Sequence, residues 1–193
     1  MARPKEFDPA QALERAMDVF WRKGYDATSV QDLVEGMGIN RASLYGTFGD
    51  KHSLFVAALD RYADSAGREV IECLSREGPA DQVLGQTLRQ LVAWQAESGR
   101  GCFMTNAAVE LCQRCPETAS KVQASLERLR EAFEVLVARG QAEGSFAARR
   151  SPEALAHYLC GVMQGLIVLG KSRQPQGVLE QAADVALDAL RGV

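Results

Sequence analysis

Apolar residues recur at helical spacing along the whole chain. In the first such stretch, Leu13, Ala16, Met17 and Phe20 follow one another at i, i+3, i+4 and i+7, which places them on one face of a helix. Sustained alternation of apolar and polar residues is missing, and so are the Asn-Gly and Asp-Gly pairs that are typical of hairpins. The pattern therefore predicts an all-α protein.

Capping residues divide the first part of the chain into short helices. The first is predicted to begin at Asp8 and to end at Gly24. The second is predicted to begin at Thr28, with Gln31 completing a capping box, and to end at Gly38. A tight turn then leads into the next helix.

The third predicted helix begins at Asn40 and ends before Gly49, and its Leu44 faces inward. A fourth helix, capped by Asp50, is expected to continue to about Arg76. The Gly-Pro pair at 78–79 breaks the pattern, and we expect further helices over about 81–97, 103–114, 117–143, 151–172 and 175–190. The fold class is therefore an N-terminal three-helix helix-turn-helix domain (residues 1–55) followed by a helical sensing and dimerisation domain (residues 56–193).

Composition narrows the class of protein. The chain has 193 residues, is 47% hydrophobic and 24% charged, and has a net charge of −3, which excludes a disordered chain and a uniformly basic nucleic-acid coat. The polar start MARPKEFDPAQ predicts no signal peptide, and the run from Leu159 to Gly170 is too short for a membrane span. Five cysteines cannot all pair, so we expect a cytoplasmic protein. We expect no cofactor, no metal and no catalytic residues.

The third helix carries residue types that suit a DNA major groove. Arg41 can donate two hydrogen bonds to guanine, while Ala42 and Gly46 allow close approach to base edges. Three further hydroxyl groups on this helix can donate to phosphate oxygens (Ser43, Tyr45 and Thr47). Lys51 and the backbone amides at the start of the fourth helix suit another phosphate.

The run TSVQDLVEGMGINRASLYGTFGDKHSLF resembles the N-terminal motif of the TetR family of one-component transcriptional repressors. The match consists of Thr28-Ser29, Gly38, Leu44-Tyr45, Phe48 and Lys51, whereas Gly46 and Thr47 stand where the family often has bulky residues or histidine. The resemblance implies a homodimer that binds a palindromic operator on double-stranded DNA and is released by a small molecule or a reactive species. By position, it implies DNA contacts at Ser29, Gln31, Asn40, Arg41, Ala42, Ser43, Tyr45, Gly46, Thr47 and Lys51.

Two apolar stripes in the last two predicted helices could form a four-helix dimer interface. The glycines at 161 and 165, four residues apart, would permit close helix approach, and the alternative is that the stripes form the core within one chain. The predicted interface residues are Leu155, Leu159, Val162, Met163, Leu166, Ile167, Leu179, Ala183, Ala186, Leu187 and Leu190. A ligand pocket is predicted at Trp94, Cys102, Phe103, Met104, Asn106, Phe133, Tyr158 and Met163.

The cysteines leave alternatives open. Cys102 follows Arg100 at an expected helix start, where a thiolate is favoured, so it could sense oxidants or electrophiles alone or with Cys112 and Cys115. The alternative is that the cysteines fill space in the core. Two other classes of function remain: a thiol oxidoreductase that uses Cys112 and Cys115, and a helical adaptor that binds protein. The order and spacing of the motif favour a DNA-binding transcriptional repressor.

Overall fold

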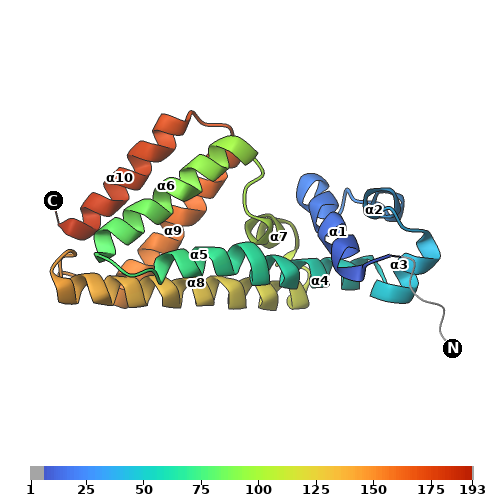
Figure 1. Ribbon diagram of the computed structural model, residues 1–193, viewed down its shortest axis with the longest axis horizontal. Coiled ribbons are helices and arrows are strands. Elements are labelled where there is room, and N and C mark those ends of the chain that lie inside the picture. The colour runs from blue at the N-terminus through green and yellow to red at the C-terminus, as the bar shows by residue number, and fades with distance from the viewer. Residues whose placement is uncertain (1–6, 193) are drawn as a thin grey trace. The chain divides into compact units, whose positions relative to one another are not determined.

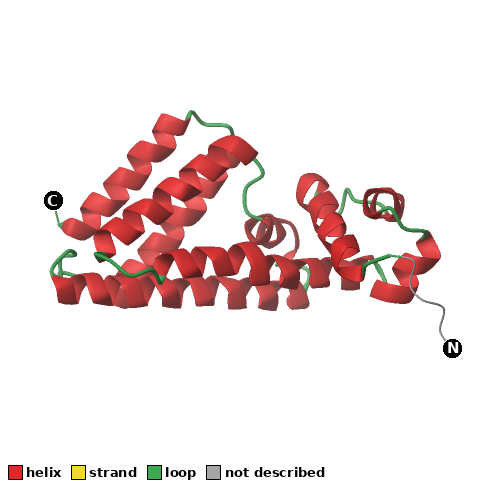
Figure 2. Ribbon diagram, in the orientation of Figure 1, coloured by secondary structure: helices red, strands yellow, loops and turns green. Residues whose placement is uncertain are grey.

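The computed structural model describes residues 7–192, and all of its regular elements are helical (Figures 1 and 2). No strand occurs in this described range, which confirms the all-α prediction. The first six residues, on which the expectation about a signal peptide partly depends, lie outside the described residues.

The chain divides into two compact units that each combine two segments. Unit 1 comprises the chain up to Ser65 together with Phe103–Val122, and unit 2 comprises Ala66–Cys102 together with Gln123–Val193. Unit 1 therefore contains more than the first 55 residues, because a later segment of the chain packs on the N-terminal helices.

Unit 1 contains α1 (Pro9–Lys23), α2 (Val30–Met37), α3 (Arg41–Phe48), α4 (Lys51–Tyr62) and α7 (Phe103–Leu111). Aromatic rings fill its centre: Phe55 makes edge-to-face contacts with Phe20, at 5.1 Å between ring centroids, and with Phe103, at 5.5 Å. Such pairs stabilise a core beyond the area that they bury. The contacts in this cluster pack α1, α4 and α7 against one another.

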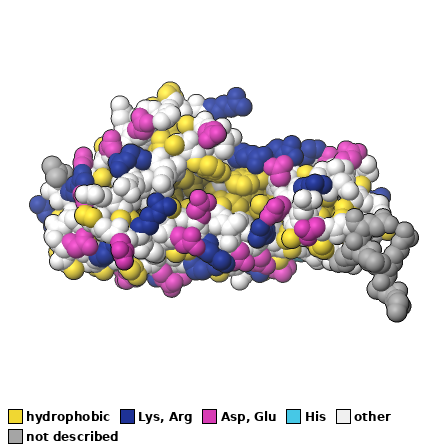
Figure 3. Space-filling model, viewed as in Figure 1, with side chains coloured by type: hydrophobic (Ala, Val, Ile, Leu, Met, Phe, Trp, Pro, Cys, Tyr) yellow, Lys and Arg dark blue, Asp and Glu magenta, His cyan; other side chains and the backbone are white. Residues whose placement is uncertain are grey.

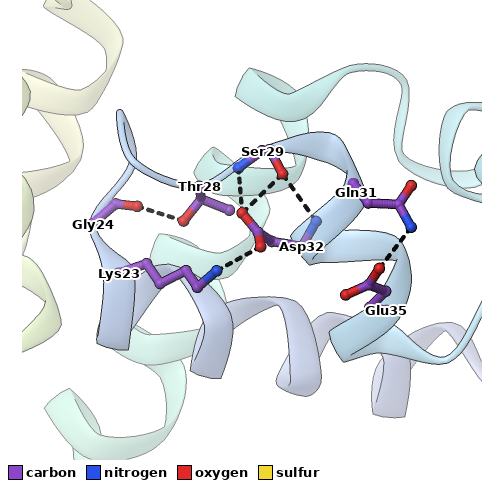
Figure 4. A network of polar contacts seen from close by, with 7 residues as sticks. All are labelled: Lys23, Gly24, Thr28, Ser29, Gln31, Asp32 and Glu35. Atoms are coloured by element: carbon purple, nitrogen blue, oxygen red, sulfur yellow. Dashed lines mark hydrogen bonds and ion pairs between the residues drawn. The ribbon is translucent and has the colours of Figure 1, made fainter.

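The start of α2 differs from the prediction by one residue. Ser29, not Thr28, is the N-cap, and Asp32 completes the capping box in place of Gln31 (Figure 4). Thr28 is buried and its hydroxyl donates to the carbonyl of Gly24, so it is not available as a cap. The side chain of Gln31 points away from the box and donates to Glu35.

The predicted long fourth helix is interrupted. After α4, the chain forms a π-helical turn at Ala63–Gly67 and then α5 (Arg68–Leu74). The boundary between the two units falls within this turn. π-helical turns insert an extra residue into a helix and occur often at functional positions.

Unit 2 contains α5, α6 (Ala80–Ser98), most of α8 (Pro116–Glu143), α9 (Pro152–Lys171) and α10 (Gln176–Arg191). Figure 1 shows α6, α9 and α10 packed together. The described chain has one helix, α9, that is long and apolar enough to cross a membrane by length and composition alone. Its Leu159, Met163 and Leu166 lie in the core of unit 2.

Candidate nucleic-acid interface

Two helix caps fix the direction of α3. Gly38 ends α2 with φ of 69°, a left-handed conformation that favours glycine, and its backbone N–H donates to the carbonyl of Val34. Two residues later, the side chain of Asn40 accepts a hydrogen bond of 2.8 Å from the amide of Ser43 and caps α3. The guanidinium of Arg15 donates to the carbonyl of Met37 and so anchors the turn to α1. The turn between α2 and α3 is therefore held at both ends.

The surface of α3 has a buried side and an exposed side. Leu44 is completely buried, whereas Arg41, Ala42, Tyr45 and Gly46 are all exposed. A Cβ atom added at Gly46 would meet nothing within 4 Å. The exposed side of α3 therefore combines two small residues, Ala42 and Gly46, with two large polar ones, Arg41 and Tyr45. Small residues allow close approach to base edges, and polar ones can hydrogen-bond to them.

Two cations near this surface have no acidic partner. Among the described residues, neither Arg41 nor Lys51 forms an ion pair. The guanidinium carbon of Arg41 lies 6.0 Å from the centre of the Tyr45 ring, and the ammonium of Lys51 lies 4.3 Å from the centre of the Tyr25 ring. Contact with an aromatic face orients a cation without neutralising it. Both charges therefore remain available to an anion.

Most other lysines and arginines among the described residues of unit 1 form ion pairs. Lys23 pairs with Asp32 at 2.5 Å, and Arg22 pairs with Asp18 at 2.7 Å. On the face drawn in Figure 3, basic and acidic side chains are interspersed. The interface is thus defined by a few uncompensated charges on and beside α3 rather than by bulk charge.

Several predicted contact residues have polar groups that are already engaged. The hydroxyl of Ser29 takes part in the capping box, and the amide nitrogen of Gln31 donates to Glu35. At the start of α4, Asp50 accepts a hydrogen bond of 2.7 Å from the amide of Ser53. This amide was expected to bind a phosphate, but Asp50 already occupies it. Hydrogen bonds from the backbone and side chain of Ser53 hold the pKa of Asp50 below its usual value. Thr47 is half-buried, whereas Asn40 is exposed.

A segment that sequence reasoning did not connect to this interface holds the turn between α1 and α2. Glu110, at the end of α7, accepts hydrogen bonds from the backbone amides of Tyr25 and Asp26. Arg114 forms an ion pair with the side chain of Asp26. No local pattern could have indicated these contacts, because the partners lie 84 to 88 positions apart in the sequence.

The predicted ligand-binding residues are divided between the two units. Phe103, Met104 and Asn106 lie on α7 in unit 1, where Phe103 and Met104 are buried. Unit 2 contains Cys102, the buried residues Phe133 and Met163, and the exposed residues Trp94 and Tyr158. An open groove of about 400 Å³ in unit 2 is lined by residues of α5, its C-cap Ser75 and α8, none of which was predicted.

The predicted dimer-interface residues lie inside one chain. All of them except the half-buried Val162 are buried, in agreement with the alternative that the stripes form an intramolecular core (Leu155, Leu159, Met163, Leu166, Ile167, Leu179, Ala183, Ala186, Leu187 and Leu190). The opposite face of α9 exposes Tyr158, Gly161, Gly165 and Val168. A Cβ atom added at either glycine would meet nothing within 4 Å.

Comparison with known proteins identifies the parts of the chain. Residues 12–58 match the family model described as bacterial regulatory proteins, tetR family, and residues 82–186 match the model of a tetracyclin repressor-like C-terminal domain. An uncharacterised HTH-type transcriptional regulator of Bacillus subtilis, YezE, is 32% identical, over 98% of this chain and 100% of that protein. The HTH-type transcriptional repressor ComR of Escherichia coli is 30% identical, over 98% of this chain and 90% of ComR.

Comparison with solved structures also finds TetR-family regulators. A cysteine mutant of the TetR-family transcriptional regulator CifR, complexed with a 26-base-pair double-stranded operator DNA, is 35% identical with a TM-score of 0.86, over 97% of this chain and 99% of that chain. A helical unit that presents a capped, narrow α3, followed by a second helical unit, defines a helix-turn-helix transcriptional regulator. The chain belongs to the tetR family of bacterial regulators.

Proposed function

We propose that this regulator is a homodimeric repressor that binds a palindromic operator through α3 and leaves it when an effector binds unit 2. The observation that carries the proposal is the exposed side of α3, where Arg41 and Tyr45 flank the small residues Ala42 and Gly46. The likeness to a CifR chain complexed with operator DNA supports it. We further propose that the protein acts in the cytoplasm and has no catalytic activity of its own.

On the operator, α3 lies in the major groove and the residues around it divide into two roles. Arg41 contacts a base, because its guanidinium is exposed and forms no ion pair with a carboxylate of the described residues. Lys51 contacts a phosphate as a point charge. The other predicted DNA contacts remain part of the proposed interface, with Gly46 in contact through its backbone (Ser29, Gln31, Asn40, Ala42, Ser43, Tyr45, Gly46 and Thr47).

The dimer forms through the exposed face of α9. Tyr158, Gly161, Gly165 and Val168 follow one another at helical spacing on this face, and Val168 is 54% exposed. The two glycines leave room for a partner helix to approach closely, because no atom of the same chain covers them. Symmetric pairing of two such faces holds two copies of α3 for successive major grooves, about 34–36 Å apart.

Effector binding is supported by an unusual polar side chain in unit 2. Gln95 on α6 is 1% exposed, and neither its amide nitrogen nor its amide oxygen has a hydrogen-bond partner among the described residues. Buried amides are nearly always hydrogen-bonded, so Gln95 is suited to receive a polar group of a ligand. Binding that favours one arrangement of the dimer lowers the affinity for DNA, with a coupling free energy of typically about 1–3 kcal/mol.

Fluorescence anisotropy on duplexes from the gene's own upstream region tests the proposed function. We expect tight binding to one palindromic duplex, much weaker binding to a scrambled duplex of equal length, and an affinity that falls steeply with salt. Light scattering on the same sample reports whether the free protein is a dimer. A monomer, or equal affinity for the palindromic and scrambled duplexes, contradicts the proposal.

A further inference from the structure

Cys115 lies directly before α8, and polar groups from two elements surround its sulfur. The hydroxyl of Thr118, in the first turn of α8, donates to Cys115 Sγ at 3.3 Å. Nε2 of His52, at the start of α4, lies 3.8 Å from the same sulfur and 3.0 Å from Oε2 of Glu117. All of these residues belong to unit 1.

This environment favours the thiolate form of Cys115. Its sulfur lies at the positive end of a 28-residue helix, where a negative charge is stabilised. Hydrogen bonds from the side chain and backbone of Thr118, together with the backbone of Glu117, lower the pKa of the Cys115 thiol, although burial and the Glu117 carboxylate oppose them. The side chain is half-buried, so a small reagent can reach it.

Cys112, three residues earlier in the turn after α7, has the opposite tendency. Burial and the charge of the neighbouring Cys115 raise the pKa of its thiol. The two sulfurs therefore form an unequal pair, in which the thiolate form is more favoured at Cys115 than at Cys112. Among the described residues, no three His, Cys, Asp or Glu side chains form a group that could hold a metal ion, so a metal does not explain the pair.

Two of the remaining cysteines lie in surroundings that disfavour a reactive thiolate. Cys73 is buried, and burial raises the pKa of Cys160. Cys102 is half-buried and packs against the core of unit 2. Reactivity is therefore not shared equally among the five thiols.

We propose that Cys115 is a modification site for peroxides in the DNA-binding unit, with Cys112 as the thiol that resolves the product. The Cys115 thiolate attacks one peroxide oxygen, an S–O bond forms as the O–O bond breaks, and the leaving oxygen departs as water or an alcohol after taking up a proton. The Cys112 sulfur then attacks the sulfenic acid, a disulfide forms and water leaves. The peroxide is reduced by two electrons and the two thiols are oxidised.

The disulfide would disturb the segment that holds the DNA-binding helices in place. Cβ atoms three residues apart on a helical turn are about 5–6 Å apart, whereas a disulfide requires about 3.5–4.5 Å. The turn must therefore contract. Glu110 lies just before this turn and Arg114 lies within it, and both hold the connection between α1 and α2. We expect oxidation to weaken operator binding, a consequence that rests on the proposed function.

Alkylation followed by mass spectrometry tests the site without DNA. Iodoacetamide is applied to the folded, reduced full chain at a series of pH values, and the rate at each cysteine is measured. We expect Cys115 to react fastest at pH 7, with a pH midpoint below that of Cys160, because each unit of pKa decrease gives about ten times more thiolate below the midpoint. Thr118→Val, which removes the hydroxyl donor at nearly constant volume, is expected to raise the midpoint. Equal rates at Cys115 and Cys160 overturn the proposal.

Peroxide treatment then tests the chemistry and its consequence. We expect a Cys112–Cys115 disulfide and at least a tenfold loss of operator affinity, both reversed by dithiothreitol. Cys115→Ser, which keeps a residue suited to capping α8, is expected to resist peroxide, whereas the control Cys160→Ser remains sensitive. An unchanged response in Cys115→Ser, or full operator binding by the disulfide form, contradicts the proposal. A reduced protein that binds no operator contradicts the proposed function instead, and the alkylation rates still decide the site.

Discussion

The carboxylate of Glu110 accepts a hydrogen bond of 2.9 Å from the backbone amide of Tyr25. Its second oxygen accepts one of 2.7 Å from the next amide in the chain. Both amides lie in the connection between α1 and α2, where no helical carbonyl is available to them. A side chain of α7 thus completes the hydrogen bonding of the segment that leads to α2 and α3.

Replacing Glu110 by alanine is expected to lower both stability and operator affinity. The substitution removes the partner of two backbone donors. The hydrogen bond from Tyr25 is part-buried, so its loss is expected to cost about 1 kcal/mol, whereas the exposed amide of Asp26 can bind water instead. Urea denaturation measures the stability, and fluorescence anisotropy measures the affinity. Glu131→Ala, at an exposed position of α8, serves as a control and should change neither quantity. An alanine variant at Glu110 that behaves like the control would show that the contact contributes nothing.

The capping box of α2 predicts a pH-dependent stability. The ammonium of Lys23, followed by the amide and hydroxyl of Ser29, holds the pKa of Asp32 well below its usual value of 3.8. A depressed pKa in the folded state stabilises the protein above the unfolded pKa, and this stabilisation is lost as the pH falls below it. The difference in stability between the parent protein and Asp32→Asn is therefore expected to be constant above about pH 5 and to shrink below about pH 4.

Urea titrations of the two proteins across this pH range measure the effect. Glu35→Gln, which changes a carboxylate on the same helix outside the box, is the matched control. A difference that stays constant down to the lowest pH at which both proteins fold would contradict the assigned role of Asp32.

Replacing Gly161 by leucine is expected to convert the dimer into a monomer. The glycine lies on the open face of α9, where an added Cβ atom meets nothing within 4 Å. The larger leucine side chain is therefore expected to extend into the space that the partner helix would fill. Light scattering over a range of concentrations reports the mass, while circular dichroism checks the fold. Gly177→Leu, at an equally open position of α10, is a control for the substitution itself. A dimeric Gly161→Leu protein would place the interface elsewhere.

Replacing Gln95 by methionine is expected to stabilise the protein. The buried amide has no hydrogen-bond partner in the described part of the chain, and its removal relieves a penalty of about 1–3 kcal/mol at nearly constant volume. The same change is expected to weaken the response to an effector that hydrogen-bonds to this amide. Thermal unfolding measures the first effect, and Gln181→Met, at an exposed position of α10, is the control. A large loss of stability would reveal a bound water or another polar partner at Gln95.

The short helices of unit 1 could be predicted because their determinants are local. Asp8, Asn40 and Asp50 cap helices as their residue types indicate. The predicted cap of α2, Thr28, lies one residue before the observed cap, Ser29. Both residue types cap helices well, and only the burial of Thr28 decides between them. Local sequence therefore fixes element existence better than element boundaries.

Contacts between distant segments could not be predicted in the same way. The Glu110 carboxylate and the pair formed by Cys115 and His52 depend on how α7 and the start of α8 pack, which no spacing reports. The apolar stripes of α9 and α10 predict a dimer interface, with the core of one chain as the alternative, and burial places Leu159 and Leu187 in the core. Periodicity shows that a face is apolar without showing what covers it.

Paired variants of Arg41 and Lys51 test most directly whether the exposed side of α3 contacts bases. Anisotropy titrations at several salt concentrations compare the operator with a duplex in which the contacted guanines are replaced. We expect Arg41→Ala to lose about 1–3 kcal/mol of discrimination between the two duplexes, and Lys51→Ala to weaken binding to both equally and to reduce the salt slope by about one. Unchanged discrimination and affinity in Arg41→Ala would contradict the account.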